Sequence, residues 1–169
     1  MSKKNSVDKF IDFSFFQKKK RLFNSDEFAI VTGGCGRIGS IYTSLFLLYG
    51  IKVIVLSRTN KNFLDFSSNL NSDLRKKIFW KKLDLRKGTS IESIAKFLKN
   101  KKIKFLVNNA AYSNRGKFFS YNQKNLNEEL WGTFAGSMLL TEKILPRLRK
   151  NKNSKIIFTG SLWGKKTPR

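Results

Sequence analysis

A glycine-rich segment between an apolar run and a helical repeat constrains the fold of this chain more than any other feature. Residues 28–32 are apolar or β-branched, and the letters TGGCGRIG then run from Thr32 to Gly39. From Ile38 to Gly50, apolar side chains recur at the three- and four-residue spacing that is typical of a helix. A second apolar run at 52–57 completes a unit of strand, helix and strand. Two strands joined in this way lie parallel in one sheet.

The alternation of strands and helices continues along the chain. The same patterns predict further strands at 78–83, 103–107 and 156–159, and further helices around 63–70, 91–98 and 126–149. The strands are nearly continuous apolar runs, which indicates a parallel sheet covered by helices on both faces. We therefore expect an α/β fold, with one domain at 28–169 and a charged, aromatic N-terminal extension at 1–27.

The composition narrows the function classes. The formal net charge is +24, but the lysines are scattered in short runs without a nucleic-acid-binding motif. We interpret them as a solvated basic surface, with nucleic-acid binding as the less favoured alternative. One cysteine and no histidine exclude an internal disulfide and leave no metal-ligand spacing, which fits a cytoplasmic protein. No stretch approaches the roughly 18 to 20 apolar residues of a membrane span, so we expect no membrane partner.

The glycine segment has the spacing of a phosphate-binding loop. Gly34, Gly36 and Gly39 form the pattern G-x-G-x-x-G between a strand and a helix. In such a loop the three glycines allow a tight turn, close approach of the backbone to a pyrophosphate, and close packing of helix on strand. The phosphates then lie at the helix N-terminus. The sequence predicts dinucleotide binding here, with a glycine-rich turn that holds no ligand as the alternative.

The end of the second strand bears on which dinucleotide is bound. An acidic residue there accepts hydrogen bonds from the 2′-hydroxyl of NAD, but this chain has Ser57 and Arg58. A guanidinium suits a 2′-phosphate, and Arg37 in the loop adds positive charge to the same pocket. We therefore expect NADP in preference to NAD. The alternatives are that Arg58 is a surface cation or that it stacks on the adenine.

Four segments in order resemble the short-chain dehydrogenase/reductase family. They are TGGCGRIG at 32–39, LDL with Asp84, NNAA at 108–111 and IIFTGS ending at Ser161. The resemblance runs from about Phe28 to the end of the chain. It implies a Rossmann-type doubly wound parallel sheet with strand order 3-2-1-4-5. It also implies hydride transfer between a nicotinamide cofactor and a small-molecule carbonyl or alcohol substrate, with a similarity to enzymes of sugar and surface-polysaccharide metabolism.

The resemblance also assigns roles to residues. Asp84 would bind the adenine amino group, Asn108 would brace the sheet, Ala110 would lie beside the cofactor, and Ser161 would hydrogen-bond the substrate carbonyl. Together with the loop and the second strand, the predicted cofactor-binding residues are Thr32, Gly33, Gly34, Gly36, Arg37, Ile38, Gly39, Ser57, Arg58, Asp84, Leu85, Asn108, Asn109 and Ala110. Other roles stay open, because Asp84 and Asn108 also suit turns and Ser161 also suits a helix N-cap.

Three departures from the family pattern are visible. Arg37 replaces the usual middle glycine of the loop, and Thr133 stands where the long helix usually carries the asparagine of a proton relay. None of the four tyrosines has a lysine four residues later, although the family uses that pair for acid and base catalysis. We therefore expect a cofactor-binding portion that lacks the family's C-terminal strands and helices. A non-catalytic nucleotide-binding module is the alternative, and homo-oligomerisation is left open.

Overall fold

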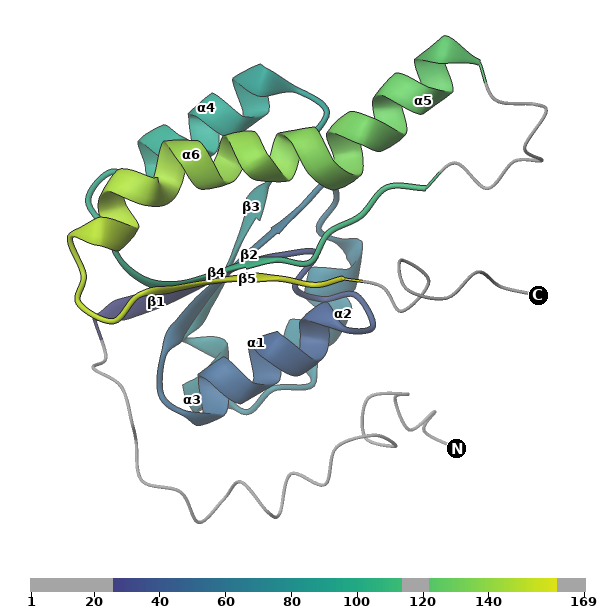
Figure 1. Cartoon of the computed structure of the whole chain (residues 1–169). Helices are drawn as coiled ribbons and strands as arrows, with labels where there is room; N and C mark the ends of the chain where they lie inside the picture. The colour runs from purple at the N-terminus through teal and green to yellow at the C-terminus, as the bar shows by residue number, and fades with distance from the viewer. Residues whose placement is uncertain (1–25, 114–121, 161–169) are drawn as a thin grey trace, which may run out of the picture.

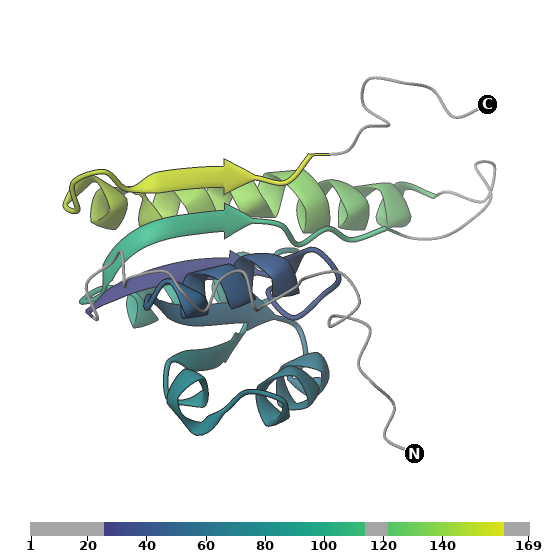
Figure 2. The same ribbon diagram turned by 90° about the horizontal axis from the view of Figure 1, so that it is seen from below.

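A five-stranded parallel sheet forms the centre of the computed structural model, which describes residues 26–113 and 122–160 (Figure 1). The strands lie in the order β3-β2-β1-β4-β5, and Figure 2 shows them side by side with β5 at one edge. Their bounds are β1 Glu27–Thr32, β2 Lys52–Ser57, β3 Ile78–Lys82, β4 Lys102–Asn108 and β5 Lys155–Phe158. This order and the parallel pairing confirm the predicted doubly wound α/β fold.

Helices cover both faces of the sheet. The helices are α1 Gly39–Leu48, α2 Lys61–Ser68, α3 Ser72–Arg75, α4 Gly88–Phe97, α5 Gln123–Leu130 and α6 Gly136–Arg149. In Figure 1, α4 and α6 lie above the sheet, whereas α1 and α3 lie below it. The central strands β1 and β2 therefore bury both of their faces, which is why they read as continuous apolar runs rather than as alternating ones. The edge strands β3 and β5 are more exposed.

Two apolar clusters fill the spaces between the sheet and its helices. On one face, Ile30, Ile54 and Leu106 pack with the apolar sides of α4 and α6. On the other face, Val31 and Val55 pack with the apolar side of α1. Successive residues of a strand point to opposite faces, so β1 alternates between the two clusters along its length. The sheet is thereby fixed in register, and with it the positions at which the strands end.

The long predicted helix differs most from expectation. It begins at Gln123 rather than at Leu126, and Trp131–Ala135 between α5 and α6 forms a π-helical segment, η3. Helical periodicity did not predict this wider turn, which is frequently found at functional sites. The structure also adds the short helix α3, whose N-terminus is capped by the Asn71 side chain accepting from the Leu74 amide at 2.9 Å.

The strand order places a crevice beside β1. The chain passes from β1 to β2 on one side and reaches β4 on the other, so the connections after β1 and β4 diverge. Ligands of open α/β sheets bind at such a point, outside the carboxyl ends of the strands. Within the described residues, no helix is long and apolar enough to cross a membrane.

Candidate functional site

A cleft of about 760 Å³ lies at the carboxyl ends of the strands. It brings together most of the residues predicted from the sequence, namely Thr32, Gly33, Gly36, Arg37, Ile38, Ser57, Arg58, Asp84, Leu85, Asn109 and Ala110. Three of the predicted residues, Gly34, Gly39 and Asn108, do not line the cleft. Thr133 lies behind its wall, and Ser161 lies outside the described residues.

A second cleft, of about 730 Å³, lies at the opposite end of the sheet. Its lining includes Glu27 at the start of β1, Lys102 at the start of β4 and Pro146 of α6. Ligand sites in open α/β sheets lie at the carboxyl ends of strands, and the second cleft holds none of the predicted site residues. The first cleft is therefore the candidate site.

The glycine loop has a conformation that only small residues permit. Gly33 has φ +63° and accepts a hydrogen bond from Gly36 at 2.9 Å, so the tight turn belongs to Gly33 rather than to Gly34. A Cβ on Gly34 would lie 2.9 Å from Thr43 Oγ1 and 3.0 Å from Val55, so Gly34 provides the close packing of helix on strand. A Cβ on Gly39 would overlap the Gly33 carbonyl. The functions predicted for the motif are present, but the glycines that provide them differ from those that the motif predicts.

The N-terminus of α1 presents unused donors to the cleft. Ile38 is the N-cap residue, and no side chain caps the helix. The amides of Arg37 and Ile38 have no hydrogen-bond partner in the described part of the chain, and both residues line the cleft. Helix N-termini leave such donors to be satisfied by a cap, by water or by an anion. The structure therefore has the donor set of a phosphate site at the place that the motif predicts.

Thr32 and Asn109 join the glycine loop to the end of β4. The buried Thr32 hydroxyl donates to the Val107 carbonyl at 3.2 Å and accepts from the Asn109 and Ala110 amides, each at 2.9 Å. The Asn109 side chain donates to the Thr32 carbonyl at 3.1 Å. These bonds fix the two sides of the crevice relative to each other, so both residues shape the cleft.

Asn108 connects the sheet to the long helix. Its Nδ2 donates to Thr141 Oγ1 on α6 at 2.9 Å, and Thr141 in turn donates to the Ser137 carbonyl at 2.8 Å. These bonds link β4 to α6, and the bracing role that the resemblance implies stays a prediction. The Asn108 Oδ1 is buried without a partner among the described residues.

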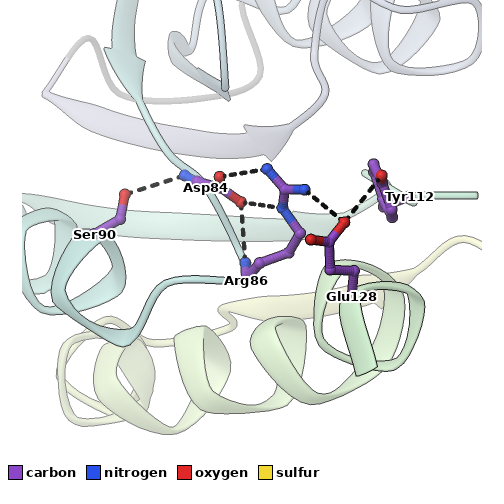
Figure 3. Close-up of polar contacts among 5 residues, drawn as sticks. All are labelled: Asp84, Arg86, Ser90, Tyr112 and Glu128. Atoms are coloured by element: carbon purple, nitrogen blue, oxygen red, sulfur yellow. Dashed lines mark hydrogen bonds and ion pairs between the residues drawn. The ribbon is translucent and has the colours of Figure 1, made fainter. Parts of the chain in front are cut away.

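Asp84 lies in a polar network that the sequence did not predict (Figure 3). The Arg86 guanidinium donates to both oxygens of the Asp84 carboxylate, at 3.0 Å and 2.8 Å. It also donates to Glu128 of α5 at 3.2 Å, and the Tyr112 hydroxyl donates to the same Glu128 oxygen at 3.2 Å. The hydrogen bond from Arg86 is the main reason that the pKa of Asp84 is lowered. Asp84 is therefore ionised, and each of its carboxylate oxygens already accepts a hydrogen bond from Arg86.

Thr133 holds the segment that follows β4. Its hydroxyl donates to the Tyr112 carbonyl at 2.8 Å and accepts from the Tyr112 amide at 3.1 Å. The neighbouring Gly132 allows this contact, because a Cβ there would lie 2.5 Å from the Tyr112 Cβ. The π-helical segment therefore fixes Tyr112 at its main chain. A role for Thr133 in proton transfer stays a prediction.

The turn after β2 is held by Ser57. Its hydroxyl donates to the Thr59 carbonyl at 2.7 Å and accepts from Trp80 Nε1 at 2.9 Å. These bonds fix the turn that carries Arg58, whose guanidinium carbon lies 5.2 Å from the centre of the Tyr112 ring. Sequence reasoning missed Trp80, Arg86 and Tyr112 as site residues. Asp84 and Arg86 stand two positions apart after a predicted strand, and that was the one local signal available.

Cys35 lines the cleft beside the glycine loop. Burial raises the pKa of its thiol to about 12. A thiol with a raised pKa is protonated near pH 7, which disfavours nucleophilic chemistry. Among the described residues, no group of histidine, cysteine and acidic side chains is arranged to bind a metal ion.

The paired state of Asp84 predicts a specific dependence of stability on pH. A carboxyl whose pKa is lowered by folding stabilises the protein above its unfolded pKa, close to the ordinary value of 3.8, and loses that contribution as the pH falls through the lowered value. We expect Asp84→Asn to lower the free energy of unfolding at pH 7. Below about pH 4, the difference in this free energy between the variant and the wild type should become smaller. Urea titrations between pH 3 and pH 7 measure this. Asp65→Asn, on the exposed side of α2, gives the background, and a gap of constant size would contradict the expectation.

The sequence profile of the short chain dehydrogenase family matches residues 27–169. The chain therefore belongs to this family, which confirms the predicted resemblance. Two curated relatives are similar to it. The bifunctional protein gal10 of Schizosaccharomyces pombe is 27% identical over 136 residues, and the uncharacterized oxidoreductase YciK of Escherichia coli is 25% identical over 156 residues. The alignments cover 80% and 89% of this chain but 18% and 61% of those relatives, so the chain spans less than two thirds of their length.

Solved structures share the fold. A glucose/ribitol dehydrogenase of this family from Brucella melitensis superposes with a TM-score of 0.76 at 21% identity, covering 89% of this chain and 63% of that one. A short chain oxidoreductase from Pseudomonas aeruginosa, solved with NADPH and described as having an atypical catalytic centre, gives 0.71 at 23% identity. That match covers 85% of this chain and 57% of the other. At these identities the similarity establishes the fold.

Proposed function

We propose that this chain binds NADP(H) and forms the cofactor-binding part of a short-chain oxidoreductase. The observation that carries the proposal is the uncapped N-terminus of α1, whose unused amides face a cleft between the glycine loop and β4. Dinucleotide pyrophosphates bind at this position in Rossmann folds. The Pseudomonas aeruginosa oxidoreductase solved with NADPH has the same fold, which supports the proposal.

The charges around the cleft favour the phosphorylated cofactor. Arg37, Arg58 and Arg86 line it, whereas Asp84 is its only acidic lining residue among those described and is paired with Arg86. The end of β2 carries Ser57 and Arg58 instead of a carboxylate that would accept hydrogen bonds from a 2′-hydroxyl. An additional 2′-phosphate would therefore meet the guanidinium groups of Arg37 and Arg58, whereas the one carboxylate among the described lining residues, Asp84, is paired with Arg86. These positions support a preference for NADP over NAD.

Different residues of this chain would bind the cofactor and take part in the reaction. The amides of Arg37 and Ile38 would bind the pyrophosphate, and Gly36 would leave space for it, because a Cβ there has no neighbour within 4 Å apart from the Gly33 carbonyl at 3.2 Å. Bound nicotinamide supplies or accepts the hydride that interconverts a carbonyl and an alcohol. Ser161 would donate a hydrogen bond to the substrate carbonyl, and Thr133 would take part in proton transfer through its hydroxyl. No tyrosine and lysine pair with four-residue spacing occurs in the sequence, so the general acid is not assigned to these residues.

Further parts of the proposal concern the whole protein. We place the function in the cytoplasm and take residues 28–169 as one cofactor-binding unit after an extension at 1–27. A substrate from sugar or surface-polysaccharide metabolism stays our prediction. Binding of the nucleotide without turnover is the second candidate, because the cleft offers donors for a cofactor whereas the sequence has no tyrosine and lysine pair for acid and base catalysis. Steady oxidation of NADPH in the presence of a panel of carbonyl compounds would favour the oxidoreductase over binding without turnover.

Replacing Arg58 tests the cofactor assignment. We expect the wild type to bind NADPH more tightly than NADH in fluorescence titrations. Arg58→Gln should raise the dissociation constant for NADPH about tenfold, because it removes a charge-assisted hydrogen bond to the 2′-phosphate, and should leave NADH within about twofold. Lys61→Gln, a nearby cation at the start of α2, is the matched control and should change neither constant. Absence of binding by either nucleotide to a folded wild type would refute the proposed function.

A further inference from the structure

Two arginines approach the ring of Tyr112 at the edge of the cleft. The guanidinium carbon of Arg86 lies 4.9 Å from the ring centre, and that of Arg58 lies 5.2 Å from it. All three residues line the same cleft. They come from three connections, after β2, β3 and β4, which are far apart in the sequence. Such distances to an aromatic ring are those of cation–π contacts.

The two arginines differ in how their charge is used. Arg86 pairs with Asp84 at 2.8 Å and with Glu128 at 3.2 Å, so its guanidinium is neutralised by two carboxylates. Arg58 is exposed and forms no ion pair in the part of the chain that the structure describes. An anion that enters the cleft therefore finds the charge of Arg58 available and that of Arg86 already occupied.

Tyr112 is held from several sides. Its hydroxyl donates to Glu128, and its amide and carbonyl both bond to Thr133 (Figure 3 shows the contact with Glu128). Its Cβ lies against Gly132, where a side chain would not fit. The ring is consequently a fixed surface, whereas Arg58 reaches it from a turn with a long, rotatable side chain. The contact restricts Arg58 more than it restricts Tyr112.

We infer that Tyr112 is a positioning residue that holds Arg58 at the cleft for the 2′-phosphate, and that it thereby helps to set the preference for NADP over NAD. The inference rests on the proposed function. An arginine loses much of its rotamer freedom when it binds a phosphate, and this loss weakens binding. Stacking on a fixed ring restricts the side chain before the ligand arrives, so less freedom is lost on binding. NADH has no 2′-phosphate, so its affinity does not depend on this contact.

The test is the ratio of the NADH and NADPH dissociation constants in Tyr112 variants of the whole chain, measured by fluorescence titration. Tyr112→Leu removes the aromatic ring, and we expect the NADPH constant to rise about fivefold with NADH almost unchanged. Tyr112→Phe keeps the ring and removes only the bond to Glu128, so it should retain the wild-type ratio. Arg58→Gln with Tyr112→Leu completes a double-mutant cycle. With Arg58 absent, loss of the ring should no longer change the ratio.

Each outcome decides the inference. A parallel loss of both nucleotides in Tyr112→Leu shows that Tyr112 supports the fold alone and overturns the inference, as does an unchanged ratio. A ratio that falls equally with and without Arg58 shows that Tyr112 acts by another route. Failure of the proposed function is distinct, because the wild type would then bind neither nucleotide or would not prefer NADPH.

Discussion

Replacing Gly39 by alanine should abolish saturable binding of NADPH. The added Cβ would overlap the carbonyl of Gly33 and lie 2.8 Å from Asn109 Nδ2, so the loop must open. Gly33 has φ +63° and cannot simply shift within the tight turn, and Asn109 is held by the Thr32 carbonyl. The start of α1 then moves away from the end of β4, and the amides of Arg37 and Ile38 no longer face the phosphates. Fluorescence titration of NADPH up to millimolar concentration measures the loss.

The matched control for this prediction is Gly88→Ala. Gly88 is also the first residue of a helix, but a Cβ there meets nothing within 4 Å. We expect the control to bind NADPH as the wild type does. Circular dichroism of both variants checks that the helices are retained, because the core on both faces of the sheet is untouched. Wild-type affinity in a folded Gly39→Ala variant would show that the loop does not hold the pyrophosphate.

Much of the fold could be predicted because the strands are visible in the sequence as separate apolar runs. The runs at β1, β2 and β4 are largely apolar, since most of their residues are buried or half-buried, and their order along the chain is unambiguous. The edge strands were harder to delimit. In β5 only Ile157 is half-buried and the other three residues are exposed, so periodicity gives little information about where that strand begins.

The parts of the site that escaped prediction depend on contacts between distant segments. Arg86, Tyr112 and Glu128 meet only because two connections and helix α5 converge at one end of the sheet, and no local pattern of residue types indicates that convergence. The π-helical segment is also a tertiary feature, since it fits Gly132 and Thr133 against Tyr112. Residues that belong to a motif with fixed spacing could be predicted from the sequence. Residues whose role depends on contacts between distant segments could not.

The same distinction applies to Arg58. From the sequence it was a cation at the end of a strand, with a role on a phosphate, on adenine or on the surface. In the structure it lies on an aromatic ring within the cleft and has no carboxylate partner among the described residues. Its charge is therefore available in the cleft, and its neighbour Ser57 holds the turn that carries it. The cofactor proposal is supported by the position of the Arg58 guanidinium in the cleft and by its lack of an ion pair within the described part of the chain, rather than by its residue type alone.

Gly136→Ala should cause a large loss of stability, because Gly136 is buried at the start of α6. Gly136 is the first residue of α6, and a Cβ there would overlap the Leu85 carbonyl and lie 2.7 Å from the Trp131 carbonyl. Both obstacles are backbone atoms, so no side chain can rotate to relieve the contact. We expect the free energy of unfolding in urea to fall by about 2 to 3 kcal/mol, as for overpacking of a close contact.

The same substitution should also weaken nucleotide binding, because Leu85 and its neighbours Asp84 and Arg86 line the cleft. Moving α6 away from the Leu85 carbonyl shifts the wall on which the adenine end of a dinucleotide would lie. Gly88→Ala is again the control, and it should be neutral or stabilise by up to about 1 kcal/mol, since alanine is favoured over glycine in a helix. A Gly136→Ala variant as stable as this control would mean that α6 does not approach the β3–α4 connection as closely as described. Retained stability with lost binding is not expected from this geometry, because one displacement of the helix causes both effects.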